Sequence, residues 1–228
     1  MNLLNLIIEN REYLKIFYGF IITLVCAVIV LKVDRLFRIS MHQGIRYFRN
    51  AFFFYGLAFF TRYILGTNLL DSYVNNLYFL IIKIFLEFLL IMAGFFLLYS
   101  LLWKKIEGTS NNYSSSLLNP ALLLFYAFSL IIISLDYVWD TYSVMFFSQI
   151  LIFSFASLIS LVNLQNAESR YQFPKFYFIA MAMSLIAWIL NALAALLFNW
   201  DYLIIIVVSS INVIIFLLFL YGVLKITK

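Results

Sequence analysis

Long apolar runs constrain this chain more than any other feature of its sequence. A helix that crosses the ~30 Å hydrocarbon core of a bilayer needs about 18 or more apolar residues, at a rise of about 1.5 Å each. The chain is 66% hydrophobic with only 11% charged residues. Seven stretches of sufficient length lie near residues 14–33, 46–66, 75–102, 117–136, 143–164, 174–198 and 202–224. The sequence therefore predicts an all-α integral membrane protein, with one seven-helix transmembrane domain over residues 1–228 and no soluble domain.

The distribution of basic residues predicts the orientation of these helices. Lys and Arg concentrate in cytoplasmic loops under the positive-inside rule. The loops and helix ends on one side, which include Lys32, Arg49 and Lys104, carry eleven basic residues against three acidic ones. We therefore expect a multi-pass protein of the cell membrane, with its N-terminus outside and its C-terminus in the cytoplasm. The net charge of +5 is spread over short loops, so the expected partner is the lipid bilayer and not nucleic acid.

A weak internal similarity indicates a duplication. A shift of 129 residues lays the second helix over the sixth, with Arg46 over Lys175 and Arg62 over Asn191. This pattern predicts parallel repeats of three helices joined by the fourth, a 3+1+3 arrangement. Low-complexity apolar sequence also aligns easily with itself, and topology alone places basic residues at cytoplasmic helix ends.

Polar side chains inside the predicted spans mark the candidate site. An ionisable group at the centre of a membrane helix costs at least ~2.5–3.5 kcal/mol, so it should face the bundle interior or water. Helical spacing places these side chains on single faces, which we expect to converge on an outward-facing vestibule with aromatic walls. The alternative is that they only hold helices together, with Lys83 and Glu87 as an intrahelical ion pair. The candidate ligand-binding residues are Arg62, Lys83, Glu87, Trp188, Asn191, Ser209 and Asn212.

Catalytic and metal-binding motifs are missing from the sequence. The one histidine, His42, lies in a basic loop, and there is no H-E-x-x-H, G-x-S-x-G or phosphate-binding glycine loop. We therefore expect neither an enzyme nor a metal ion or cofactor. The favoured interpretation is a receptor-like sensor or accessory membrane protein that binds a small ligand or a partner helix. Its basic loops would dock an acidic protein partner, cytoplasmic or in the membrane, or anionic lipid.

Two architectural resemblances give alternatives. In helix count, orientation and repeat, the chain looks like the SWEET sugar transporters, which implies a small-solute transporter. It departs from them because its two prolines lie at the starts of spans and interrupt none, and few glycines lie within the spans. The microbial rhodopsins share seven helices and an outside N-terminus, which implies a retinal-type photoreceptor. Their seventh-helix lysine corresponds to Asn212 here, so Lys83 with Glu87 would have to replace it. Neither resemblance includes a shared motif, so both are analogies of fold.

Overall fold

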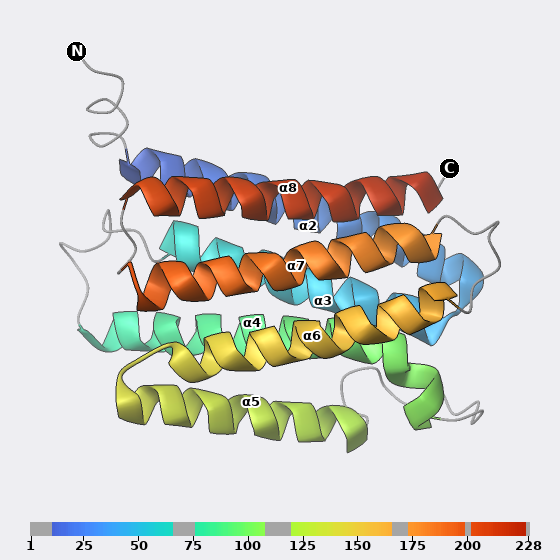
Figure 1. The fold of residues 1–228 in the computed structure, drawn as a ribbon, viewed down its shortest axis with the longest axis horizontal. Coiled ribbons are helices and arrows are strands. Elements are labelled where there is room, and N and C mark those ends of the chain that lie inside the picture. Colours follow the sequence, from blue (N-terminus) through green and yellow to red (C-terminus); the bar gives the residue numbers. More distant parts are fainter. Residues whose placement is uncertain (1–10, 66–75, 108–119, 166–172, 199–201, 227–228) are drawn as a thin grey trace, which may run out of the picture.

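The computed structural model describes residues 11–65, 76–107, 120–165, 173–198 and 202–226, and the regular structure in these ranges is helical (Figure 1). Each helix bonds its own backbone groups internally, as a chain in lipid must. The elements are α2 (Arg11–Ser40), α3 (Gln43–Phe60), the π-helix η1 (Thr61–Leu65), α4 (Asn76–Glu107), α5 (Pro120–Trp139), α6 (Ser143–Gln165), α7 (Phe173–Leu196) and α8 (Tyr202–Ile226).

Helix boundaries follow local sequence signals. Pro120 and Pro174 lie in the first turns of α5 and α7, where a proline removes no intrahelical hydrogen bond. Met41 joins α2 to α3 with a left-handed φ of 51°. The helix α2 continues to Ser40, beyond the predicted end at residue 33, because hydropathy marks only the apolar part of a helix. Its last turns are polar, and Arg38 Nε lies 2.9 Å from Asp34 Oδ2 one turn away.

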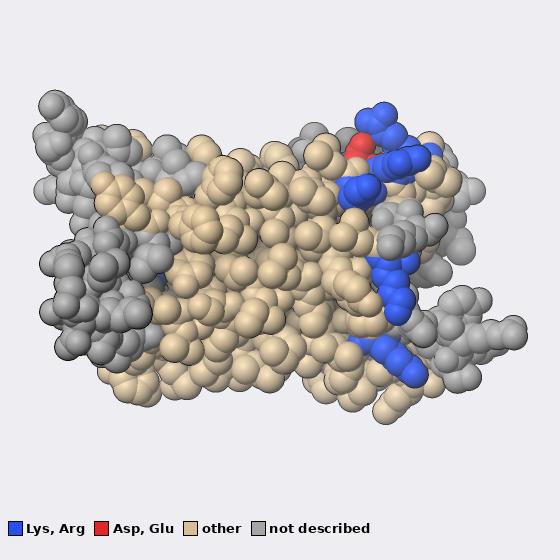
Figure 2. Space-filling view, turned by 90° about the horizontal axis from the view of Figure 1, so that it is seen from above, with Lys and Arg blue, Asp and Glu red and all other residues tan. Residues whose placement is uncertain are grey.

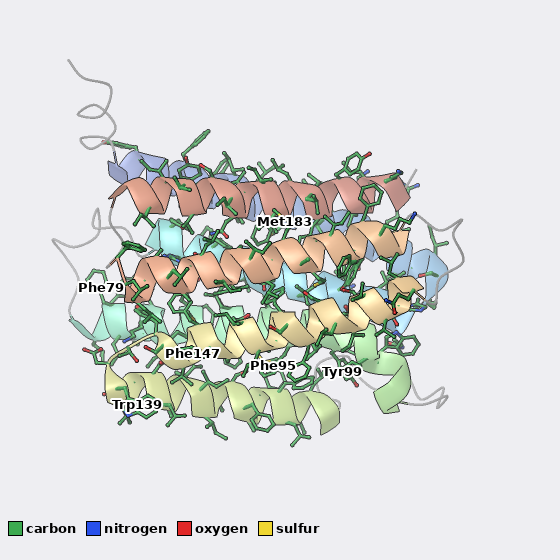
Figure 3. The ribbon with its side chains drawn as sticks, in the orientation of Figure 1. Phe79, Phe95, Tyr99, Trp139, Phe147 and Met183 are labelled. Atoms are coloured by element: carbon green, nitrogen blue, oxygen red, sulfur yellow. The ribbon has the colours of Figure 1, made fainter. Side chains whose placement is uncertain are left out.

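Six helices form a closed ring around the core. Neighbours in the ring follow the order α2, α3, α4, α6, α7 and α8, and α8 packs back on α2. The helix α5 lies outside this ring against α4 and α6. Phe95 and Tyr99 of α4 hold it there through Phe125, with ring centroids 4.7 and 5.7 Å apart (Figure 3). The internal duplication stays a prediction.

The surface of the bundle is that of a membrane protein. Large apolar side chains such as Leu31, Phe147 and Trp139 are 60–72% exposed, which a soluble domain avoids over large areas. Six helices are long and apolar enough to cross a bilayer. About 50% of the residues in the apolar part of α4 are buried inside the bundle, compared with 22% in α5. The fold thus defines a multi-pass α-helical membrane protein.

The helix α3 differs from the other six predicted spans. It is absent from the six span candidates found in the described residues. As an α-helix it has 18 residues, it carries Arg46, Arg49 and Asn50, and it continues into the π-helix η1. Eight of its residues are buried against neighbouring helices. Because it faces protein more than lipid, its sequence need not be as apolar, and a seventh span stays a prediction.

Charge divides the two ends of the bundle. The end where α2 meets α3, α7 begins and α8 ends carries seven basic side chains against Asp34 among the described residues (Figure 2). The opposite end carries the acidic side chains Asp136 and Asp140 and the basic side chains Arg62 and Lys83. We call the first of these the basic end. The basic residues are Lys32, Arg35, Arg38, Arg46, Arg49, Lys175 and Lys225.

Candidate functional site

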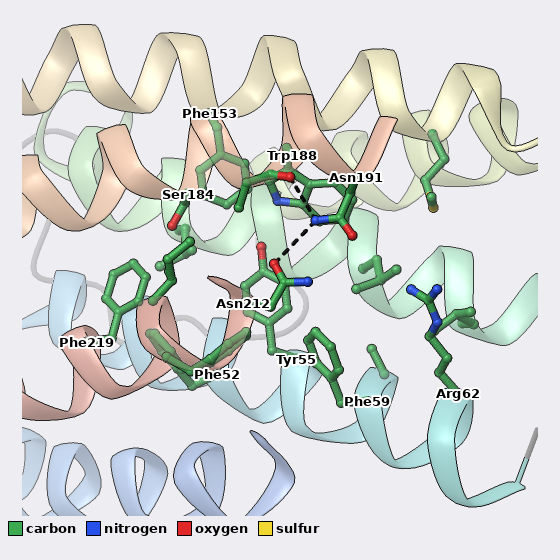
Figure 4. A pocket seen from close by; sticks show the side chains of 18 of the residues that line it. Phe52, Tyr55, Phe59, Arg62, Phe153, Ser184, Trp188, Asn191, Asn212 and Phe219 are labelled. Atoms are coloured by element: carbon green, nitrogen blue, oxygen red, sulfur yellow. Dashed lines mark hydrogen bonds between the residues drawn. The ribbon is translucent and has the colours of Figure 1, made fainter. Parts of the chain in front are cut away.

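A narrow pocket lies inside the ring, toward the end opposite the basic end. Its volume is about 60 Å³, which holds roughly two to four water molecules. Aromatic rings from α3, α6 and α8 form much of its wall, and Arg62, Trp188, Asn191 and Asn212 supply polar groups (Figure 4). We call this space the outer pocket. Its other lining residues are Phe52, Tyr55, Ala58, Phe59, Leu86, Leu90, Leu97, Met145, Phe146, Phe153, Ser184, Ala187, Ile215, Phe216 and Phe219.

Two asparagines join α7 to α8 at the centre of the outer pocket. The Asn191 side-chain nitrogen donates to the Ala187 carbonyl oxygen at 2.8 Å and to Asn212 Oδ1 at 3.3 Å. Each amide keeps one further group, and neither the Asn191 oxygen nor the Asn212 nitrogen has a hydrogen-bond partner among the described residues. Both atoms lie on the side of their amides that faces Arg62 (Figure 4). An acceptor and a donor are therefore available in a pocket that Arg62 also lines.

Arg62 owes its position to the change of helix type after α3. The backbone widens from α-helix to π-helix at Thr61, and Thr61 Oγ1 donates to the Leu57 carbonyl oxygen at 2.8 Å. Such π-turns insert an extra residue and often occur at functional sites. The Arg62 guanidinium carbon lies 5.3 Å from the centre of the Tyr63 ring, within cation–π range. The turn directs a positive charge to the outer end of the pocket.

Trp188 forms the wall on the α7 side. Its ring lies 6.2 Å from Phe146 and 6.3 Å from Phe153 of α6, measured between ring centroids. These aromatic contacts fix the indole, which lies over the pocket opposite Tyr55 (Figure 4). Trp188 was a candidate ligand-binding residue because it is the one tryptophan inside a predicted span. The structure places it in the wall of the outer pocket.

Lys83 and Glu87 do not line the outer pocket. Lys83 Nζ lies 3.2 Å from Asp140 Oδ1 and 4.6 Å from the centre of the Tyr142 ring. The ion pair therefore joins α4 to the α5–α6 turn, whereas the sequence analysis considered a pair with Glu87. Glu87 is only 1% exposed, and its Oε1 has no hydrogen-bond partner among the described residues. Ser209 is buried on α8 but is also not a lining residue.

Two other buried polar residues have structural roles. Asp136 accepts hydrogen bonds from the backbone N–H groups of Val144, at 2.9 Å, and Met145, at 2.7 Å, and so caps the first turn of α6. Gln149 Nε2 donates to the Leu90 carbonyl oxygen at 2.9 Å and joins α6 to α4. Helix-to-helix hydrogen bonds of this kind stabilise membrane bundles.

A second and larger cavity lies at the basic end, and no sequence pattern predicted it. Its volume is about 590 Å³, within the ~300–1,000 Å³ of small-molecule sites. We call it the inner cavity. Residues from α2, α3, α4, α6, α7 and α8 line it, and these are Val33, Leu36, Ser40, His42, Gly44, Ile45, Phe48, Ser100, Leu101, Ser160, Asn163, Tyr177 and Val223.

Aromatic rings separate the two spaces. Phe52 and Phe219 line the outer pocket, and Phe48 lines the inner cavity. The Phe48 and Phe52 rings lie 4.8 Å apart and the Phe52 and Phe219 rings 5.1 Å apart, between centroids. We call Phe48, Phe52 and Phe219 the aromatic layer. Sequence analysis missed it because a core phenylalanine and a phenylalanine between two cavities follow the same helical spacing.

Metal-ligating chemistry is sparse. In the part of the chain that the structure describes, no three His, Cys, Asp or Glu side chains come together as a group that could hold a metal ion.

Comparison with known proteins finds no matching family model, no matching curated protein and no matching solved structure. Assignment of function therefore depends on the geometry of the outer pocket and the inner cavity.

Proposed function

We propose that this protein is a seven-helix membrane sensor or accessory component that binds a small ligand in the outer pocket. The observation that carries the proposal is the meeting of four residues from three elements. Arg62 of η1 provides a positive charge, the amides of Asn191 and Asn212 provide a further acceptor and donor, and Trp188 provides a flat apolar wall. Pockets with mostly apolar walls and a few convergent polar groups are the usual form of small-molecule sites.

The chemistry of these groups favours a small organic anion with a neutral polar group. A carboxylate beside Arg62 gains a charge-assisted hydrogen bond, and a hydroxyl or amide can bond to the Asn191 oxygen and the Asn212 nitrogen. Because the pocket holds about 60 Å³, such a ligand has to displace side chains as it enters. Binding would thus be coupled to a shift of η1, α7 or α8, which is what a sensor requires.

The orientation in this proposal follows the positive-inside rule. The basic end would face the cytoplasm, so the outer pocket would open toward the outside and the N-terminus would lie there. The basic side chains at the other end of α2, α3, α7 and α8 would be available to an acidic protein partner or to anionic lipid. A ligand signal would travel along these helices from one face of the membrane to the other.

A binding experiment tests this proposal. We would replace Trp103, Trp139 and Trp200 by Phe, so that Trp188 alone reports, and titrate small carboxylates and matched neutral amides into the full chain in nanodiscs. We expect a saturable change in Trp188 emission with a carboxylate, absent with its amide. Asn212→Leu should abolish it, and Asn163→Leu, outside the pocket, should not. An equal response in both asparagine variants would refute the pocket as the site.

Transport is the second candidate, and the two spaces along α3 favour it. The outer pocket and the inner cavity lie on either side of the aromatic layer, as expected for a closed pathway with one gate. Uptake of a labelled carboxylate into proteoliposomes distinguishes the candidates. Accumulation that increases in Phe52→Ala supports a transporter, whereas binding to Trp188 without accumulation supports a sensor.

A further inference from the structure

The inner cavity has the shape of a site for an amphiphile. Ser40, His42 and Asn163, which lie at or near helix ends, are exposed and form a polar mouth. Buried lining residues, such as Val33 and Val223, are mostly apolar. An exposed polar rim beside a mainly apolar buried lining matches the head and tail of an amphiphile.

The polar groups deep in the inner cavity already have partners inside the protein. Ser100 Oγ and the Tyr177 hydroxyl lie 3.0 Å apart in a hydrogen bond. Ser160 Oγ donates to the Ser157 carbonyl oxygen at 2.9 Å. An apolar chain can therefore occupy this depth without leaving a buried polar group unpaired. Water is a poor alternative, because roughly twenty molecules would face mainly apolar walls in a space of about 590 Å³.

The charge around the mouth selects the head of the amphiphile. Arg46 lies one helical turn from His42 on α3, and Lys175 and Lys225 lie at the same end on α7 and α8. Among the described side chains at this end the one acid is Asp34, which pairs with Arg38 and Arg49. Basic clusters of this kind attract anionic lipid head groups.

We propose that the inner cavity holds the acyl chain of a single-chain anionic amphiphile, a fatty-acid-like carboxylate whose head lies at the basic mouth. This site is separate from the outer pocket and does not depend on the function proposed for that pocket. Occupancy of the cavity would support Phe48 and the rest of the aromatic layer from the basic end.

Trp103 offers a local reporter at the mouth. Its ring meets the His42 ring edge-on, with centroids 4.9 Å apart. In full-length protein with Trp139, Trp188 and Trp200 replaced by Phe, in phosphatidylcholine nanodiscs, dibrominated stearate should quench Trp103 saturably. A matched variant keeps only Trp139, on the outer surface of α5. Its emission should fall in proportion to the added amphiphile without reaching a plateau, as expected for an amphiphile dissolved in the bilayer.

Variants of the cavity and its rim separate the tail from the head. Ile45→Phe on α3 and Val223→Phe on α8 each fill part of the cavity and should weaken quenching about tenfold. Dibrominated stearyl alcohol should bind about fivefold more weakly than the acid. Arg46→Gln should remove that preference, and Lys32→Gln, an equal change of charge on the exposed face of α2, should keep it.

Each outcome decides the proposal. The proposal is overturned if quenching of Trp103 rises linearly without a plateau, or if the acid and the alcohol bind equally. It is also overturned if a folded Ile45→Phe or Val223→Phe variant binds as well as the unchanged protein. If neither filled variant folds by circular dichroism, competition decides instead. Displacement of the brominated acid by plain stearate but not by inorganic phosphate supports the acyl-chain site, and displacement by phosphate alone overturns it. The Trp188 response to carboxylates tests the outer pocket separately.

Discussion

The contact between Gly19 and Tyr63 gives the sharpest test of the packing around the outer pocket. Gly19 lies on α2, and Tyr63 follows Arg62 in η1. A Cβ atom added at Gly19 would lie 2.2 Å from Tyr63 Cβ and 2.7 Å from Tyr63 Cγ, whereas carbon atoms prefer about 3.5–4.0 Å. A Cβ atom cannot rotate away, so Gly19→Ala has to move η1 and α2 apart by more than about 1 Å.

The expected loss of stability follows from this geometry. Overpacking of a well-packed interior costs about 1–3 kcal/mol, and a Cβ-to-Cβ clash belongs at the upper end. For a chain of this length, about 2–3 kcal/mol corresponds to a fall in Tm of roughly 4–12 °C. Gly222→Ala is the matched control, because nothing lies within 4 Å of its added Cβ. It should be neutral or stabilising by up to about 1 kcal/mol.

A second substitution shows whether the clash itself is responsible. Tyr63→Gly removes the Cβ that Gly19→Ala would meet, so in that background Gly19→Ala should be nearly harmless. Tyr63→Ala keeps the Cβ and should give no rescue. Thermal unfolding of each variant in nanodiscs measures both effects. If Gly19→Ala is tolerated as well as Gly222→Ala, the close approach of α2 and η1 is wrong, and so is the placement of Arg62 that depends on it.

Three further predictions concern the buried polar residues. Gly94→Ala places a Cβ 2.7 Å from Gln149 Oε1 and should lower the free energy of unfolding by about 1 kcal/mol. A double-mutant cycle with Gln149→Ala, measured as free energies of unfolding, should remove most of this loss. Asp136→Ala leaves two N–H groups of α6 without their acceptor and should cost about 1–2 kcal/mol, measured as a lower Tm. Lys83→Met with Glu87→Gln should change stability but not the Trp188 response to carboxylates, because neither residue lines the outer pocket. If the response is lost, the two residues contribute to ligand binding.

Hydropathy predicts most of this fold because the bilayer imposes one length and one composition on a lipid-facing helix. Composition is a weaker guide where a helix faces protein. The helix α3 carries Arg46, Arg49 and Asn50 and still packs within the ring. The polar turns that extend α2 to Ser40 escape the same criterion, since ion pairs such as Asp34 with Arg38 stabilise them. Neither result follows from composition alone.

The candidate site was predictable only in part. Helical spacing correctly groups side chains by face, but it does not tell which neighbouring helix each face meets. Asn191 and Asn212 meet across α7 and α8, whereas Lys83 turns to Asp140 in the α5–α6 turn. Glu87 lies apart from the outer pocket. The rotation of each helix is set by packing over its whole length, so the sequence cannot sort pocket residues from those that join helices.

Unused hydrogen-bonding capacity that faces the outer pocket makes that distinction in the structure. Asp136 accepts two backbone bonds and caps a helix, so its environment explains it without a ligand. Asn191 and Asn212 satisfy each other only halfway, and their remaining groups face Arg62 inside the outer pocket. A pair retained only for a ligand would gain stability by replacement with leucines, which pack without polar groups to satisfy, whereas a pair that holds α7 to α8 would lose stability. If Asn191→Leu with Asn212→Leu raises stability and abolishes the carboxylate response, the two amides are there for a ligand; lower stability would assign them to the scaffold.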